Sequence, residues 1–204
     1  SGSITLGSEY RLRGFSLTDQ RPALSLGAAY DDPSGFYGGG SLVAHDPKHG
    51  PARILGHTEY VGYAVRRDGG PSFDVGFANV DMTVYGDRRR RLEYQQVYVG
   101  VAQEAVAARL SYSPDYPRKG VDTAYLDLNA AVRPAEHWRL TGRLGTTIRL
   151  GGSRAIDGSA ERYDLRVALA RTFERAELQV AWTAVTPRRQ PRNRRPASGL
   201  SVAA

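Results

Sequence analysis

The sequence predicts an all-β protein, a transmembrane up-and-down antiparallel β-barrel of about twelve strands that forms a single domain over residues 1–204. Three observations support this fold class. Apolar residues recur with a period of two along most of the chain, long and short connections alternate, and one face of each strand carries no charge. Residues 123–132, TAYLDLNAAV, show the pattern: leucine, alanine and valine alternate with tyrosine, aspartate and asparagine.

The composition excludes a bundle of transmembrane helices but is compatible with a membrane barrel. Hydrophobic residues make up 41% of the 204 residues, and no run approaches the ~18 apolar residues that a transmembrane helix needs. A barrel strand needs only alternate apolar residues. The absence of cysteine suits an exported protein, and the chain opens on SGSITL, within the first strand, as a processed mature protein does.

The alternation divides the chain into twelve expected strands joined by turns that are long, then short. Short turns such as DDPSG and ERA alternate with longer connections such as GFSLTDQRP and PDYPRKGVD. Membrane barrels have this asymmetry, with short periplasmic turns and longer outer loops. The strands are expected at 3–14, 23–31, 36–45, 53–65, 72–85, 92–103, 106–113, 123–133, 138–150, 162–173, 176–186 and 198–204.

The uncharged face is expected to contact lipid. A lysine or arginine at the bilayer midplane costs ~2–4 kcal/mol, so selection should keep this face free of charge. Its alanines and glycines would fill the core of a soluble, lipocalin-like barrel poorly, whereas acyl chains flow around small residues. Aromatic residues, among them Tyr30, Trp138 and Trp182, lie towards strand ends, where interfacial girdles form.

The opposite face carries charges of both signs and is expected to line the lumen. Barrels of about 8 strands are filled by side chains and barrels of about 16 enclose a channel, so twelve strands leave two interpretations open. The charges could form a mutually satisfied network that fills the lumen, or the arginines could line a narrow pore that prefers anions. The candidate lumen residues are Glu9, Arg11, Arg13, Glu59, Asp74, Arg109, Asp127, Arg139, Arg143, Arg149, Asp164 and Arg166.

Several segments resemble a known bacterial family in the same order along the chain. They are SEYRLRGFSLTDQRPALSLGAAY, SGFYGG, QQVYVGV, RLSYSPDY and YLDLNAAV, and the resemblance extends from about Ser8 to Thr186. The chain thereby resembles the Gcw_chp family, the TorF-type porins of Gram-negative bacteria. The resemblance implies an outer-membrane β-barrel but brings no catalytic residues. The chain departs from barrels of this kind in ending on SVAA, without a terminal aromatic residue.

Two expected outer loops are strongly basic. We expect their guanidinium groups to contact lipopolysaccharide phosphates or the acidic surface of an outer-membrane protein partner. No nucleic-acid partner is expected, because no recognition helix or binding-sheet motif accompanies the arginines. The candidate contact residues are Arg88, Arg89, Arg90, Arg91, Arg188, Arg189, Arg192, Arg194 and Arg195.

The function predicted from sequence is a narrow channel for small polar solutes in the bacterial outer membrane, with no enzymatic activity and no cofactor. The alternative is a non-conducting structural or accessory barrel that partners another outer-membrane protein. A lesser alternative is a lipid-modifying enzyme, since a pairing of the third and fourth strands could place Ser41 opposite His57, with Glu59 on the same face. His45 and His49, with Asp46, could hold a metal near the loop that follows the third strand, but without a third firm ligand no metal site is predicted.

Overall fold

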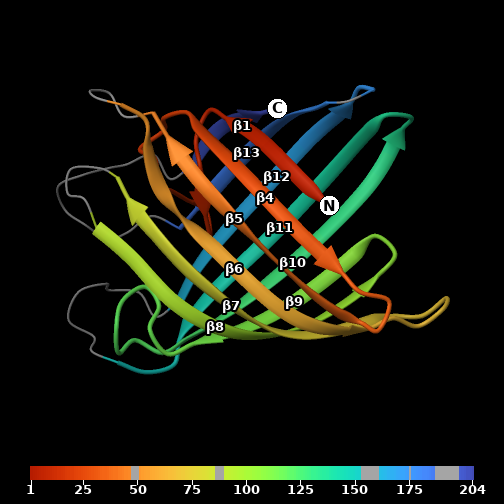
Figure 1. Ribbon diagram of the computed structural model, residues 1–204, viewed down its shortest axis with the longest axis horizontal. Helices are drawn as coiled ribbons and strands as arrows, with labels where there is room; N and C mark the ends of the chain where they lie inside the picture. The colour runs from red at the N-terminus through yellow and green to blue at the C-terminus, as the bar shows by residue number, and fades with distance from the viewer. Residues whose placement is uncertain (47–50, 86–89, 153–160, 175, 187–197) are drawn as a thin grey trace.

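The computed structural model describes residues 1–46, 51–85, 90–152, 161–174, 176–186 and 198–204, which form a closed barrel of twelve antiparallel strands (Figure 1). Each strand pairs with its neighbours along the chain, and β1 pairs with β14 to close the barrel. None of the described residues belongs to a helix long and apolar enough to cross a membrane. The predicted fold class is confirmed.

The wall strands follow the predicted spans closely. Their bounds are β1 Gly2–Gly7, β4 Ala23–Asp31, β5 Phe36–His45, β6 Arg53–Val65, β7 Ser72–Val84, β8 Arg90–Gln103, β9 Val106–Ser113, β10 Thr123–Ala135, β11 Trp138–Arg149, β12 Glu161–Thr172, β13 Glu177–Val185 and β14 Ser198–Ala203. The strand ends that flank the long connections lie at one end of the barrel, which we call the long-loop end, and the strand ends that flank the short turns lie at the other (Figure 1).

The first strand is the main departure from the predicted spans. The wall strand β1 ends at Gly7, and residues 8–22, which we call the inner segment, turn into the barrel instead of continuing the strand to residue 14. Within the inner segment, β2 (Arg11–Leu12) and β3 (Phe15–Ser16) form a small separate hairpin. Its two-residue turn has positive φ at Arg13 (46°) and Gly14 (78°), as a type I′ turn requires.

Over most of the wall, large apolar side chains point outward and are exposed. Along β11 and β12, for example, Leu144, Leu165 and Val167 are 46%, 39% and 42% exposed. In a soluble protein such residues would be buried, so this distribution is that of a barrel whose outer surface is covered by lipid. The exposed apolar side chains therefore lie on the face that the sequence predicts to contact lipid.

Near the long-loop end of β5–β8 the pattern reverses. Val80, Met82 and Leu92 point inward and are buried, whereas Asp81, Arg91 and Glu93 lie on the outward face between them. The inward side chains form an apolar cluster with residues of the inner segment. The cluster consists of Leu17, Ala23, Val43, Leu55, Val80, Met82, Leu92, Tyr94 and Tyr116, with Tyr10, Leu12, Val84 and Tyr85 packed against it. This part of the wall is therefore built like a soluble sheet around a core.

A β-bulge in β6 contributes to the reversal. Val43 pairs with Gly56 and Ala44 pairs with Ile54, so Leu55 is an extra residue on β6. An extra residue moves every following side chain to the other face of the sheet. Glycine is required at the bulge, because a Cβ on Gly56 would overlap the backbone of Asp81 and Met82.

Candidate functional site

The candidate site is the lumen, which the inner segment crosses from wall to wall. Its apolar side packs on β5–β8 through Leu17 and the apolar cluster. Its turn reaches the opposite wall, where a Cβ on Gly14 would lie 2.7 Å from Cβ of Asp164 on β12 and 3.2 Å from Cβ of Val185 on β13. The inner segment therefore occupies part of the lumen and leaves open only the space beside it.

Arg13 attaches the inner segment to the wall. Its guanidinium carbon lies 3.9 Å from the ring centroid of Tyr116, 4.2 Å from that of Tyr125 and 5.3 Å from that of Tyr94. One terminal nitrogen donates a hydrogen bond to the side-chain carbonyl of Gln96 at 2.7 Å. A desolvated cation among aromatic rings is strongly attracted to them. Arg13 is only 5% exposed, so the contact is sheltered from water.

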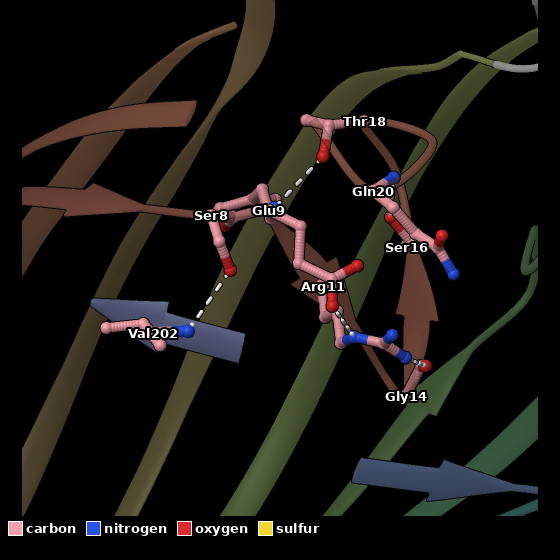
Figure 2. Close-up of polar contacts among 9 residues, drawn as sticks. Ser8, Glu9, Arg11, Gly14, Ser16, Thr18, Gln20 and Val202 are labelled. Carbon is pink, nitrogen blue, oxygen red and sulfur yellow. Dashed lines mark hydrogen bonds and ion pairs between the residues drawn. The ribbon is translucent and has the colours of Figure 1, made fainter. Parts of the chain in front are cut away.

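Short polar bonds hold the rest of the inner segment (Figure 2). Thr18, which is fully buried, accepts a hydrogen bond from the backbone N–H of Tyr10 at 3.1 Å, and Ser16 accepts one from the N–H of Gln20 at 3.0 Å. At the entry to the segment, the hydroxyl of Ser8 accepts a hydrogen bond from the N–H of Val202 on β14 at 3.1 Å. The segment is therefore tied both to itself and to the wall.

A cavity of about 270 Å³ remains between the inner segment and β11–β14. Arg11 lies at its inner side, bonded to Glu9 at 2.7 Å and to the carbonyl of Gly14 at 2.9 Å (Figure 2). The residues that line the cavity are Glu9, Arg11, Gly14, Arg143, Asp164, Arg166, Thr183, Ser201, Val202 and Ala203. Half of these ten residues are charged.

Tyr125 on β10 connects the charges beside this cavity. Its hydroxyl accepts a hydrogen bond from Arg143 at 2.9 Å and donates one to Asp164 at 3.0 Å. Arg143 also donates to Asp127 at 2.7 Å. These bonds satisfy charges that would otherwise be costly to hold in a partly buried lumen.

A second network lies on the wall formed by β5, β7, β8 and β9. Asp74 accepts hydrogen bonds from Tyr37 at 2.7 Å and from Arg109 at 3.0 Å. The hydroxyls of Tyr37 and Tyr98 are 2.9 Å apart, and the Arg109 guanidinium lies 4.4 Å from the Tyr98 ring centroid. This network is separate from the residues that line the cavity.

The structure places most of the predicted lumen residues on the inward side, but in different roles. Glu9, Arg11 and Arg13 belong to the inner segment and not to a wall strand. Asp74, Arg109, Asp127, Arg143, Asp164 and Arg166 lie on the inward face of wall strands, within the networks and the cavity described above. Arg139 forms an ion pair with Glu177. Arg149 is the last residue of β11 and lies on the same face of that strand as Arg139 and Arg143.

Glu59 lies on the outward face, contrary to the prediction. It shares a face with Val61 and Tyr63, which are exposed on the outer surface. The bulge at Leu55–Gly56 is the reason, since it moves the side chains that follow to the opposite face. The Glu59 carboxylate lies 3.8 Å from Nε2 of His57 and does not touch the lumen.

The inward tyrosines are the functional residues that sequence reasoning missed. Tyr125 bridges Arg143 and Asp164, Tyr37 and Tyr98 together connect Asp74 with Arg109, and Tyr94 and Tyr116 surround Arg13. A signal was present, because Tyr125 falls in the same phase as Asp127, and Tyr98 falls in the phase opposite Val97, Val99 and Val101. Tyrosine in that phase indicates a polar contact inside the barrel, since its hydroxyl needs a partner when buried.

The basic loop residues are only partly described. Arg88, Arg89 and the arginines at 188–195 lie outside the described residues. Arg90 is exposed at the start of β8. Arg91 forms a two-pronged ion pair with Asp81, at 2.6 Å and 3.0 Å, and lies 3.6 Å from Glu93. Its guanidinium is thus engaged by carboxylates of the wall.

The register rules out the proposed relay of Ser41, His57 and Glu59. Ser41 pairs with Thr58, while His57 pairs with Leu42, so Ser41 and His57 lie on opposite faces of the sheet. The bulge again accounts for the one-residue difference. His45 is buried at 2% exposure with its ring 4.0 Å from that of Tyr85, and His49 lies outside the described residues. In the part of the chain that is described, no three His, Asp or Glu side chains converge as metal ligands would.

Comparison with known proteins identifies the family. A family model described as "Bacterial protein of unknown function (Gcw_chp)" matches residues 1–185. The chain belongs to the Gcw_chp family. A solved structure described as "NanC porin structure in rhombohedral crystal form" is similar to this Gcw_chp protein with a TM-score of 0.63 and 10% identity, covering 98% of this chain and 97% of that one. No curated protein matches the chain. At this identity the likeness shows a shared porin-type barrel fold.

Proposed function

We propose that this Gcw_chp protein is a narrow channel for small polar solutes in the bacterial outer membrane, with the inner segment as its constriction. The observation that carries the proposal is the charged cavity of about 270 Å³ between the inner segment and β11–β14. A barrel that served only as a scaffold could fill this space with apolar side chains, as it does beside β5–β8. The porin-type fold supports the same function.

The test is single-channel conductance in a planar lipid bilayer. Two variants are compared, each with a larger side chain on β14, one on its inward face and one on its outward face. Ser201 lines the cavity, whereas the neighbouring Leu200 is 67% exposed on the outer surface. We expect Ser201→Trp to reduce the conductance step severalfold, because its indole occupies much of the cavity. We expect Leu200→Trp to leave the step unchanged, because its indole enters lipid. Equal steps in the two variants would refute a path through the cavity.

A second candidate function is a non-conducting accessory barrel, and the inner segment favours it. The segment is anchored by the apolar cluster and by Arg13, and it spans the lumen. If the protein inserts into bilayers and shifts on a gel after heating, as folded barrels do, yet never conducts, the accessory role is supported. The predicted contact of the basic loops with lipopolysaccharide or with a partner protein would then become the first property to test.

A further inference from the structure

Arg166 differs from most other lumenal arginines in what its guanidinium contacts. Arg11, Arg109, Arg139 and Arg143 each bond to a carboxylate. Arg166 donates a hydrogen bond to the neutral side chain of Gln179, and in the described part of the chain it has no ion pair. A guanidinium has five donors, so most of those on Arg166 are available to another group.

The neighbours of Arg166 across the sheet make this cation unfavourable by itself. Arg143 is directly opposite on β11, and Thr183 is directly opposite on β13. Like charges directly opposite each other on one face are destabilising. The Thr183 hydroxyl is buried, and among the described residues it has no hydrogen-bond partner. Arg166 thus lies between the cation of Arg143 on one neighbouring strand and the unpaired hydroxyl of Thr183 on the other.

The same row borders the cavity, which also contains Arg11. Thr183 pairs in turn with Gly199, where an added Cβ would overlap the Arg11 guanidinium. The cavity lining has three arginines, and only Arg166 among them lacks a carboxylate partner, because Arg11 pairs with Glu9 and Arg143 pairs with Asp127. Its volume of about 270 Å³ equals that of roughly nine waters at ~30 Å³ each. These features define both the charge and the size of a ligand.

We propose that Arg166 and Thr183 form a binding site for a small monocarboxylate of up to about nine non-hydrogen atoms. The carboxylate would accept hydrogen bonds from the Arg166 guanidinium and supply the ion-pair partner that Arg166 lacks. Hydroxyl groups on the solute would be matched by the charged lining of the cavity. This inference deepens the proposed channel function, since it names the class of solute that pauses at the constriction.

The test is titration calorimetry on the intact, detergent-solubilised barrel in low-salt buffer, with glycerate as the probe. Glycerol is the matched uncharged probe, because it lacks the carboxylate but retains the hydroxyls. We expect glycerate to bind and glycerol to bind at least about tenfold more weakly. We expect Arg166→Gln to weaken glycerate binding by about tenfold or more, as the loss of a charge-assisted hydrogen bond does.

Arg109→Gln is the control variant, because it removes one lumenal charge on the far wall, outside the cavity lining. It should bind glycerate as the parent protein does. The proposal is overturned if glycerate does not bind, if glycerol binds equally well, or if the two variants lose affinity to the same extent. Arg166→Gln relieves like-charge repulsion and so should fold, which its shift on a gel after heating would verify.

Binding and conduction are read out separately, so the two proposals can fail separately. Glycerate binding to a barrel that never conducts would retain the site and reject the channel. Conduction that passes through the cavity, with no glycerate binding, would retain the channel and reject the site.

Discussion

Replacement of Arg13 by methionine should release the inner segment and open the lumen. Methionine retains an unbranched side chain but removes the guanidinium from among its three tyrosine rings and from the carbonyl of Gln96. If the inner segment is the constriction, its displacement should produce a larger conductance step. The change is also conservative for folding, because Arg13 belongs to no wall strand.

The size of the effect follows from the contacts of Arg13. The two nearest rings contribute about 0.5–2 kcal/mol each, and a hydrogen bond from a charged donor contributes about 1.5–3 kcal/mol. Against this stands the other terminal nitrogen, Nη1, which is buried with no hydrogen-bond partner among the described residues, at a cost of about 1–3 kcal/mol. The net stabilisation of the docked segment is about 2 kcal/mol, which corresponds to a change of about thirtyfold in the ratio of docked to displaced segment.

The assay is the fraction of time spent in the larger conductance state in a planar bilayer. We expect Arg13→Met to increase the ratio of large to small states by about thirtyfold. Arg109→Met is the matched control, since it also removes a lumenal cation near a tyrosine ring but does not touch the inner segment. Identical state ratios in Arg13→Met and the parent protein, with both barrels folded, would refute the role of Arg13 as an anchor.

Four further outcomes follow from the same geometry. Gly14→Ala should lower the free energy of unfolding by about 1–3 kcal/mol in a urea titration, because φ is 78° and the new Cβ would lie 2.7 Å from that of Asp164. Tyr125→Phe should cost about 1–3 kcal/mol in the same titration, since Asp164 and Arg143 lose their shared hydroxyl. Glu59→Leu should leave single-channel conductance and ion selectivity unchanged, because the bulge turns this residue outward; a selectivity shift would place it in the lumen. Hydrogen bonds, first from Ser34 and then from Tyr30, lower the pKa of Asp32 in the turn after β4, so its contribution to stability is present at neutral pH and is lost as the pH falls through that lowered pKa; the difference in free energy of unfolding between Asp32→Ala and the parent protein, measured by urea titration, should therefore be smaller at pH 3 than at pH 7.

The barrel wall could be predicted from sequence because lipid imposes one simple rule on it. Alternate residues must be uncharged within the bilayer, and this rule holds along β10–β13 except at the ends of β12, where Glu161 and Arg171 lie in the outward phase. The end of β1 at Gly7 could not be predicted from this alternation. The alternation of residues 8–13 suits a hairpin inside the lumen as well as a wall strand, because β2 and β3 alternate with the same period.

The two faces of β6–β8 were harder to assign because the apolar phase changes within a strand. In β7, Phe73, Val75 and Phe77 point outward, whereas Val80 and Met82, one step out of phase, point inward. The sequence contains this change, which marks where the outer surface ceases to be apolar. The single extra residue at Leu55 carries no comparable signal, since a bulge depends on the backbone of two paired strands.

The phase reversal and the inner segment require each other. Met82, Val43 and Leu55 are at most 1% exposed only because Leu17 and its neighbours cover them from within the lumen. Without that cover, the inward apolar side chains near the long-loop end would face water at a cost of about 25 cal/mol for each Å² uncovered. The two halves of the wall therefore differ in their inward side chains. Strands β5–β8 present an apolar surface on which the inner segment docks, and β11–β14 present charges that keep the remaining space polar. A displaced inner segment would consequently leave the charged half of the lumen unchanged, so Arg13→Met should enlarge the conductance step without reversing the ion selectivity.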